Sequence, residues 1–134
     1  TEAEWEYAAR SAGKEQEFPW GNDPPTCDLA VFNGLGCGGT TTRAVCSTPK
    51  GNTEQGVCDM AGNVAEWVED PYQASYLDAP LDAGAHRGII NTVRPYRGGA
   101  WYDGGDAMRC ASRDNNEQGR PTSDIGFRPA RTAR

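Results

Sequence analysis

Glycine and proline set the main constraint on this chain, because 17 glycines and 9 prolines stand among its 134 residues. Both residue types interrupt helices, so their density excludes a coiled coil or a helical bundle. No stretch approaches the roughly 20 consecutive apolar residues that cross a bilayer, so we expect no membrane span. Four Trp, five Tyr and three Phe still supply enough large apolar surface for a core. The sequence therefore predicts one loop-rich domain over residues 1–134.

The overall charge is acidic, since 19 Asp and Glu residues against 13 Lys and Arg give a formal net charge of −6. Proteins that bind nucleic acid concentrate positive charge, so we expect no nucleic-acid partner. Two interpretations of the acidity stay open at this stage: an affinity for cations, and a general contribution to solubility.

Five cysteines stand at positions 27, 37, 46, 58 and 110. A zinc site is disfavoured because the chain has no Cys-x-x-Cys motif and a single histidine, His86. We expect two local disulfides, Cys27–Cys37 and Cys46–Cys58, although five cysteines allow several other pairings. Two disulfides would imply an oxidising location: secreted, periplasmic or at the cell surface. The alternative is a cytosolic protein with five reduced thiols.

Regular secondary structure is expected in only a few places. Thr1 and Glu4 form a capping box, so a helix is predicted over residues 2–12 and ends before Gly13. Because natural chains rarely begin at a helix cap, we expect the domain to extend upstream of Thr1. Strands are predicted at residues 92–101, 109–113 and 125–129, and a short strand or helical turn at residues 64–68. These elements predict an α+β fold with short antiparallel strands.

Five fragments of the sequence, in this order, match one family. They are TEAEWEYAAR at residues 1–10, FPWGN at 18–22, DMAGNVAEW at 59–67, RGGAW at 97–101 and GFR at 126–128. With them, the chain resembles the C-terminal half of a formylglycine-generating-enzyme (sulfatase-modifying factor) domain. The resemblance implies an irregular, loop-rich variant of the C-type lectin fold, with one N-terminal helix and bound calcium. It also implies an N-terminal portion of the domain, which would be a partner of this one.

The turn at residues 59–66 is where the resemblance implies calcium. The ligands would be the side chains of Asp59 and Glu66 and the backbone carbonyls of Gly62 and Val64, which suits the oxygen-rich shell that calcium prefers. In the alternative, the segment is only a turn, and Glu66 accepts an N–H group or joins an ion pair. A second calcium site of the family, near residues 30–32, is not expected because Val31 has no side-chain oxygen.

Catalysis would depend on two cysteines that the resemblance implies after the RGGAW segment, where the family's oxidase binds copper. The two positions fall on Asp103 and Met108, so we expect neither copper nor formylglycine generation. Cys110 matches a structural cysteine of the family. His86 alone cannot form the histidine cluster that the family's iron-dependent sulfoxide synthases need. The alternative is a metal-dependent oxidoreductase of the family, formylglycine-generating or sulfoxide-synthase-like, completed by residues outside this chain.

A ligand site is expected where the fold exposes aromatic side chains beside acids. The resemblance places Trp101, Tyr102, Asp103 and Asp106, together with the loop 114–124, at the rim of a shallow groove for a protein, peptide or glycan. Solvated loop carboxylates and a Trp101 within the core are the alternative. The sequence thus predicts a secreted, calcium-stabilised binding or scaffold module without redox catalysis.

Arginines in or beside the expected strands are predicted to form internal ion pairs with glutamates and not an anion site, because guanidinium forks order irregular backbone. The arginines are Arg97, Arg109, Arg113 and Arg128, and the expected partners are Glu4, Glu6 and Glu66.

Overall fold

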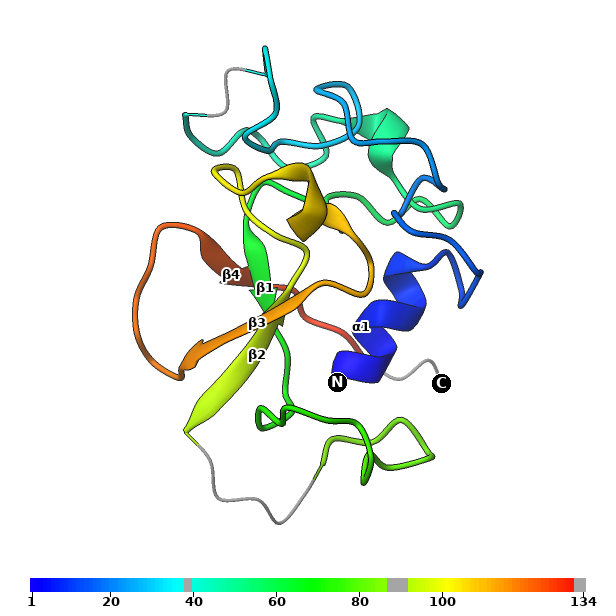
Figure 1. Ribbon diagram of the computed structural model, residues 1–134, viewed down its shortest axis with the longest axis vertical. Coiled ribbons are helices and arrows are strands. Elements are labelled where there is room, and N and C mark those ends of the chain that lie inside the picture. The colour runs from blue at the N-terminus through cyan, green and yellow to red at the C-terminus, as the bar shows by residue number, and fades with distance from the viewer. Residues whose placement is uncertain (38–39, 87–91, 132–134) are drawn as a thin grey trace.

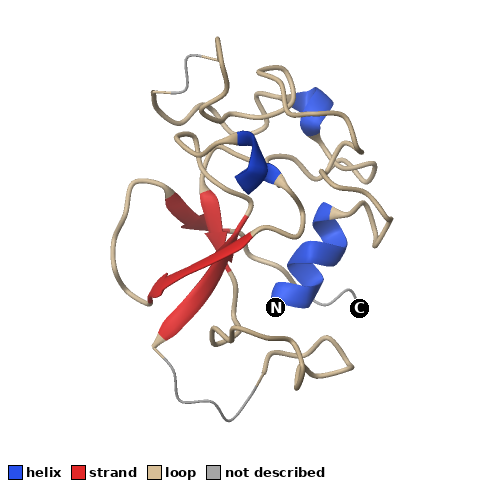
Figure 2. Cartoon of the chain, viewed as in Figure 1, coloured by secondary structure: helices blue, strands red, loops and turns tan. Residues whose placement is uncertain are grey.

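The computed structural model describes residues 1–37, 40–86 and 92–131, and its elements are few and short (Figure 1). Loops connect them over most of the chain, as Figure 2 shows. The α+β, loop-rich prediction is therefore confirmed. The elements are the helix α1 (Glu2–Ala9), the 3-10 helices η1 (Pro49–Gly51) and η2 (Gly105–Met108), and the strands β1 (Ala65–Trp67), β2 (Val93–Arg97), β3 (Arg113–Glu117) and β4 (Ile125–Phe127).

The four strands form one mixed sheet in the order β3-β2-β1-β4. The pairs β3–β2 and β2–β1 are antiparallel, whereas β4 runs parallel to β1, with Ala65 opposite Ile125. The prediction of antiparallel strands alone was therefore wrong at this edge. Two strands and a long loop separate β1 from β4, which is enough chain for a parallel crossover connection.

The helix begins as predicted but is shorter than predicted. Thr1 caps it with both bonds of the capping box, and the last helical residue is Ala9 instead of residue 12. Ser11 and Ala12 have φ values of 49° and 65°, which no α-helix accommodates. The Gly13 N–H then donates to the Tyr7 carbonyl at 3.0 Å and closes the turn.

The strand boundaries also differ from the prediction. β2 ends at Arg97 because Gly98 and Gly99 have φ values of 91° and 67°, a conformation that favours glycine. The strand predicted over residues 109–113 was wrong, since η2 and a turn occupy residues 105–112 and β3 begins at Arg113. The last strand ends at Phe127 and does not reach Pro129.

Two apolar clusters fill the interior. One cluster lies among the loops and includes Phe18, Phe32 and Met108. The other packs Trp5 of α1 against Met60 and Cys110, which come from later parts of the chain. The two predicted disulfides, Cys27–Cys37 and Cys46–Cys58, are confirmed, and Cys110 is a buried free thiol. Both disulfides lie before β1 in the chain, so they cross-link the loops and leave the sheet without a covalent link.

The two faces of the sheet carry different side chains, because neighbouring residues of a strand point to opposite faces. Glu66, Arg97 and Arg113 stand opposite one another across β1, β2 and β3, and we call them the inner row. Trp67, Tyr96 and Asp114 form the next row, which we call the outer row. All three members of the inner row bond to side chains of α1, so α1 lies on the inner face (Figure 1).

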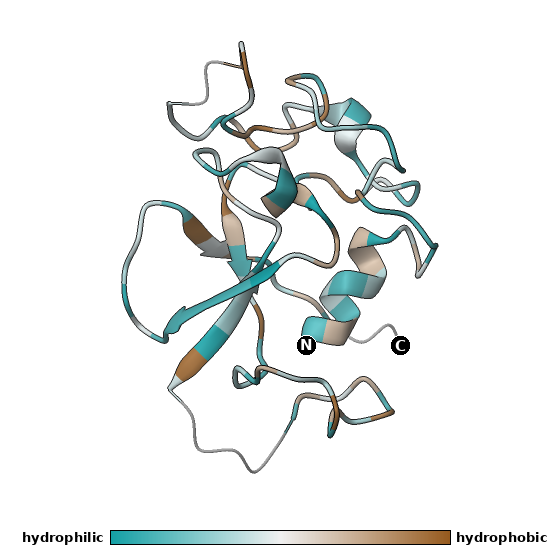
Figure 3. Ribbon diagram, viewed as in Figure 1, coloured by the Kyte–Doolittle hydropathy of each residue, from teal (hydrophilic) through white to brown (hydrophobic). Residues whose placement is uncertain are grey.

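The polar character of β3 is visible in Figure 3, where this edge strand is hydrophilic along its length. Charged and amide side chains protect an edge strand from pairing with another chain. Among the described residues, α1 is the only α-helix, and with 8 residues it is far too short to span a bilayer.

Candidate functional site

The outer row brings an aromatic pair and a carboxylate together on the open face of the sheet. The rings of Trp67 and Tyr96 meet edge to face with centroids 5.7 Å apart. Asp114 stands directly opposite Tyr96 on β3, with its carboxylate near the Tyr96 hydroxyl. Burial raises the pKa of the Tyr96 phenol, and the charge of Asp114 and its hydrogen bond raise it further. Tyr96 therefore remains a neutral donor at physiological pH.

Tyr102 repeats this arrangement from the loop that follows β2. Its hydroxyl donates to Asp124 Oδ2 at 2.8 Å, and its ring meets Trp101 edge to face at 5.3 Å. The bond to Asp124 is the main cause that raises the pKa of Tyr102 to about 12. Each of the two tyrosines, Tyr96 and Tyr102, thus has a carboxylate beside its hydroxyl group.

A small cavity of about 140 Å³ lies beside the two tyrosines. Tyr96, Tyr102, Asp103 and Asp114 line it. Since liquid water takes about 30 Å³ per molecule, the cavity has room for a few waters or one small headgroup. We call these four residues, with Asp124, the tyrosine–aspartate cluster.

The four residues predicted to bind a ligand do not share one groove. Tyr102 and Asp103 line the cavity of the tyrosine–aspartate cluster, and Trp101 supports it from behind Tyr102. Asp106 lies elsewhere, in a broad groove of about 680 Å³ beside Phe18 and the prolines at 24 and 25. Sequence reasoning missed Tyr96, although the alternation of β2 places it on the face opposite Arg97.

Asp103 and Met108 occupy the positions at which the resemblance implies the copper-binding cysteines. Asp103 Oδ2 accepts the Ala100 N–H at 2.9 Å, and the Asp103 N–H donates to the Ala100 carbonyl at 3.0 Å, so this residue closes the turn after β2. Met108 is fully buried in the loop core. Asp103 therefore belongs to a turn and Met108 to the core, so the two side chains do not form an exposed pair.

The inner row forms a buried ion-pair network with α1. Arg97, whose side chain is inaccessible to solvent, pairs with Glu6 and, at 3.1 Å, with Glu2. Arg113 donates to both carboxylate oxygens of Glu2, at 2.9 and 2.8 Å. The predicted internal role of Arg97 and Arg113 is confirmed, with Glu2 as a partner that sequence reasoning missed. Glu2 and Glu6 stand four residues apart, on one face of the helix, and this spacing was the available signal.

Arg109 differs from the other predicted arginines, because it is exposed and donates through Nε to the Asp106 carbonyl at 3.1 Å. Arg128 pairs with Glu66, as predicted. Its Nη2 donates to Glu66 Oε1 at 2.7 Å, and its Nε donates to both Glu66 oxygens at 3.2 and 3.0 Å.

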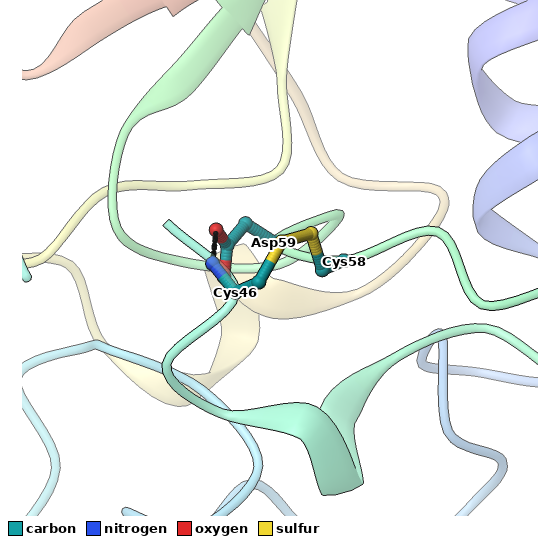
Figure 4. Close-up of side chains that lie close together, drawn as sticks. All are labelled: Cys46, Cys58 and Asp59. Atoms are coloured by element: carbon teal, nitrogen blue, oxygen red, sulfur yellow. Dashed lines mark hydrogen bonds between the residues drawn. A yellow bond between two sulfur atoms is a disulfide. The ribbon is translucent and has the colours of Figure 1, made fainter. Parts of the chain in front are cut away.

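The turn at residues 59–66 does not fit a calcium ion in this arrangement. Both oxygens of Glu66 already accept bonds, from Arg128 and from Trp5 Nε1 at 2.8 Å. Asp59 Oδ2 accepts the Cys46 N–H at 2.7 Å (Figure 4). The two carboxylates therefore serve different partners. Gly62 has a packing role, because a Cβ there would lie 2.4 Å from the Val31 carbonyl oxygen.

A second candidate metal site is formed by Cys46, Cys58 and Asp59 (Figure 4). Their two sulfur atoms and a carboxylate oxygen lie within 4.8 Å of one another, which is close enough for three ligands of one metal ion. The two sulfur atoms are bonded to each other, however, and a metal needs thiolates. This cluster is a cross-link and not a metal centre while the disulfide is intact.

Comparison with known proteins places the chain in a family. The sulfatase-modifying factor enzyme 1-like domain matches residues 1–133. The chain belongs to this family. The resemblance that the sequence motifs carried is thereby confirmed.

The chain is similar in sequence or structure to three proteins that are otherwise described very differently. Serine/threonine-protein kinase pkn1 of Chlamydia caviae is 35% identical over 133 residues, which are 98% of this chain and 20% of the kinase. Inactive C-alpha-formylglycine-generating enzyme 2 of Bos taurus is 30% identical, over 97% of this chain and 42% of that protein. The solved structure of PvdO from Pseudomonas aeruginosa matches with a TM-score of 0.84 and 34% identity, over 95% of this chain and 49% of that one. The chain spans about half, or less, of each of them.

Proposed function

We propose that this chain is a non-catalytic binding module of its family, and that its ligand presents a cationic group to the tyrosine–aspartate cluster. The observation that carries the proposal is the cavity in which Tyr96, Tyr102, Asp103 and Asp114 meet. Aromatic rings and carboxylates around one small space are the chemistry that recognises an ammonium or guanidinium group.

The charges of the cluster support a cationic ligand. The ion pairs seen among the described residues leave Asp103, Asp114 and Asp124 with phenol and backbone partners only. Arg97 and Arg113 also line the cavity, but Glu2 and Glu6 neutralise their guanidinium groups on the inner face. The outer face therefore has negative charge to offer.

The module is proposed to be non-catalytic because Asp103 and Met108 stand where the family's oxidase has its two copper-binding cysteines. One closes a turn and the other is buried, so substituting cysteines alone would not create an exposed pair. Two disulfides are in keeping with an oxidising compartment as the working location. Oxygen consumption after copper(I) loading, with a cysteine-containing peptide as substrate, would contradict the proposal.

Titration with simple probes tests the ligand class. We expect L-argininamide and tetramethylammonium to shift the NMR signals of the Tyr96 and Tyr102 rings, and a neutral methyl glucoside to leave them unchanged. Binding should weaken as ionic strength rises, because exposed charges are screened. The variant Asp114→Asn should weaken binding about tenfold, which corresponds to ~1.4 kcal/mol.

The matched control is Asp78→Asn, which removes an exposed carboxylate from a loop outside the cluster. It should bind the probes as the unmodified protein does. Shifts produced by the glucoside and not by the cations would replace the proposal with a glycan site. Equal losses in Asp114→Asn and Asp78→Asn would reduce the effect to net charge and contradict the proposal.

A further inference from the structure

The guanidinium group of Arg128 donates hydrogen bonds to several oxygen atoms of the turn where calcium was predicted. Its Nη2 donates to the Cys58 carbonyl at 2.8 Å and contacts the Asp59 carbonyl at 3.4 Å. The same nitrogen and Nε hold the Glu66 carboxylate. One cation therefore binds two backbone carbonyls and a carboxylate from both ends of the segment 58–66.

Glu66 requires such a partner, because only 8% of its side chain is exposed. A buried carboxylate without a counter-charge loses several kcal/mol of solvation, which only a close cation and hydrogen bonds offset. Arg128 supplies the charge, and the Trp5 indole supplies a further donor. The environment of Glu66 is therefore complete without a metal ion.

Asp59 shows that the other predicted carboxylate is also committed. Its backbone has a φ of 54°, and its side chain turns toward the Cys46 N–H beside the disulfide (Figure 4). Calcium takes six to eight oxygen ligands, commonly with two or more carboxylates. An ion here would have to displace Arg128 from Glu66 or to bind without Glu66.

The position of Arg128 in the chain gives this contact a structural purpose. Arg128 follows β4 directly, and β4 pairs with β1 over only three residues. Glu66 lies at the centre of β1, and Cys58 and Asp59 precede it. The guanidinium thus ties the edge strand to the turn that leads into the sheet.

We infer that Arg128 takes the place of a structural cation in this chain, so that the turn at residues 59–66 is held by a guanidinium and not by calcium. The inference is independent of the proposed cation-binding cluster, which lies on the other face of the sheet. A turn held by Arg128 should not respond to calcium, whereas the sequence motif predicts a turn that calcium stabilises.

Thermal unfolding with calcium and with chelator tests the inference. We expect the melting temperature of the unmodified protein to be the same in millimolar calcium and in EDTA, and calorimetric titration to show no saturable calcium binding. The variant Arg128→Met should melt several degrees lower in EDTA, since it leaves Glu66 buried and unpaired. Calcium should restore part of that loss, because the freed oxygens of Glu66, Cys58 and Asp59 can then hold an ion.

The control is Arg131→Met, which removes an exposed arginine three residues further along and should change nothing. If Arg128→Met does not fold, Arg128→Lys keeps the charge but loses the fork, and it should show a smaller shift with the same response to calcium. A drop in the melting temperature of the unmodified protein with EDTA would overturn the inference. An Arg128 variant that melts identically in calcium and in EDTA would also overturn it.

Discussion

The inner and outer faces of the sheet use charge in different ways. On the inner face, Arg97 and Arg113 are matched by Glu2 and Glu6 and shielded from water by α1. On the outer face, no ion pair of the described residues includes Asp114 or Asp124, which accept bonds from the Asn115 N–H and from the Tyr102 hydroxyl. Alternation along strands of three to five residues separates the two sets by a single backbone layer.

Under the proposed function, this difference separates the residues that stabilise the fold from those that bind a ligand. Buried ion pairs are costly to break because the remaining partner stays desolvated. A carboxylate that accepts one hydrogen bond still has acceptor positions for a cationic partner. Changes on the inner face should therefore affect the free energy of unfolding, and changes on the outer face should affect binding.

The largest expected effect comes from removing the guanidinium at the centre of the inner row. Arg97→Met should lower the free energy of unfolding by about 2–3 kcal/mol, because the buried Glu2 would keep only Arg113 as a cationic partner, Glu6 would keep only Arg10, and the Cys110 carbonyl would lose its donor. Urea unfolding measures this value. The exposed Arg109→Met should cost less than about 1 kcal/mol. Similar losses in the two variants would remove the distinction between the faces.

Cys110 gives a second, smaller test of the inner side. Burial raises the pKa of its thiol to about 11, and its carbonyl accepts a bond from Arg97. At pH 8 the thiolate fraction should be about a hundredfold below that of an exposed cysteine, so iodoacetamide should label Cys110 only after unfolding. The neutral thiol of Cys110 contributes fully to the stability of the fold below the ordinary pKa near 9, and this contribution is lost as the pH rises toward 11. Rapid labelling of the native protein would show that the inner side is open.

Tyr102 gives the smallest effect and belongs to the outer side. Its folded pKa is raised to about 12 from an ordinary value of 10, so its contribution to stability is complete below pH 10 and is lost between pH 10 and 12. Because the side chain is 45% exposed, the change should be a fraction of 1 kcal/mol. Phenolate absorbance in the native protein and in Tyr102→Phe isolates the group. A titration of Tyr102 near pH 10 would mean that Asp124 does not hold it.

Local signals in the sequence predicted much of the frame. The capping box located the start of α1, and the spacing of four cysteines indicated the correct disulfides. Short fragments such as RGGAW identified the family because glycines and aromatics at fixed positions reflect particular backbone turns. Each of these features is determined by residues close together in the chain.

Features that depend on distant partners were not predictable in the same way. β3 has the sequence RDNNE, which lacks any apolar alternation, and its strand conformation comes from pairing with β2. The parallel pairing of β4 with β1 likewise has no local signature. The resemblance placed Asp106 beside Tyr102, but η2 carries Asp106 into a separate groove. The separation follows from the 3-10 turn, which the sequence pattern did not show.

The disulfides have a consequence for how this molecule fails. Both close loops between residues 27 and 58, while ion pairs join the sheet to α1. A reducing agent would therefore loosen the loops and leave in place the ion pairs that hold the helix on the sheet. Reduction is thus a weakness of one part of the molecule, because the contact between helix and sheet contains no disulfide.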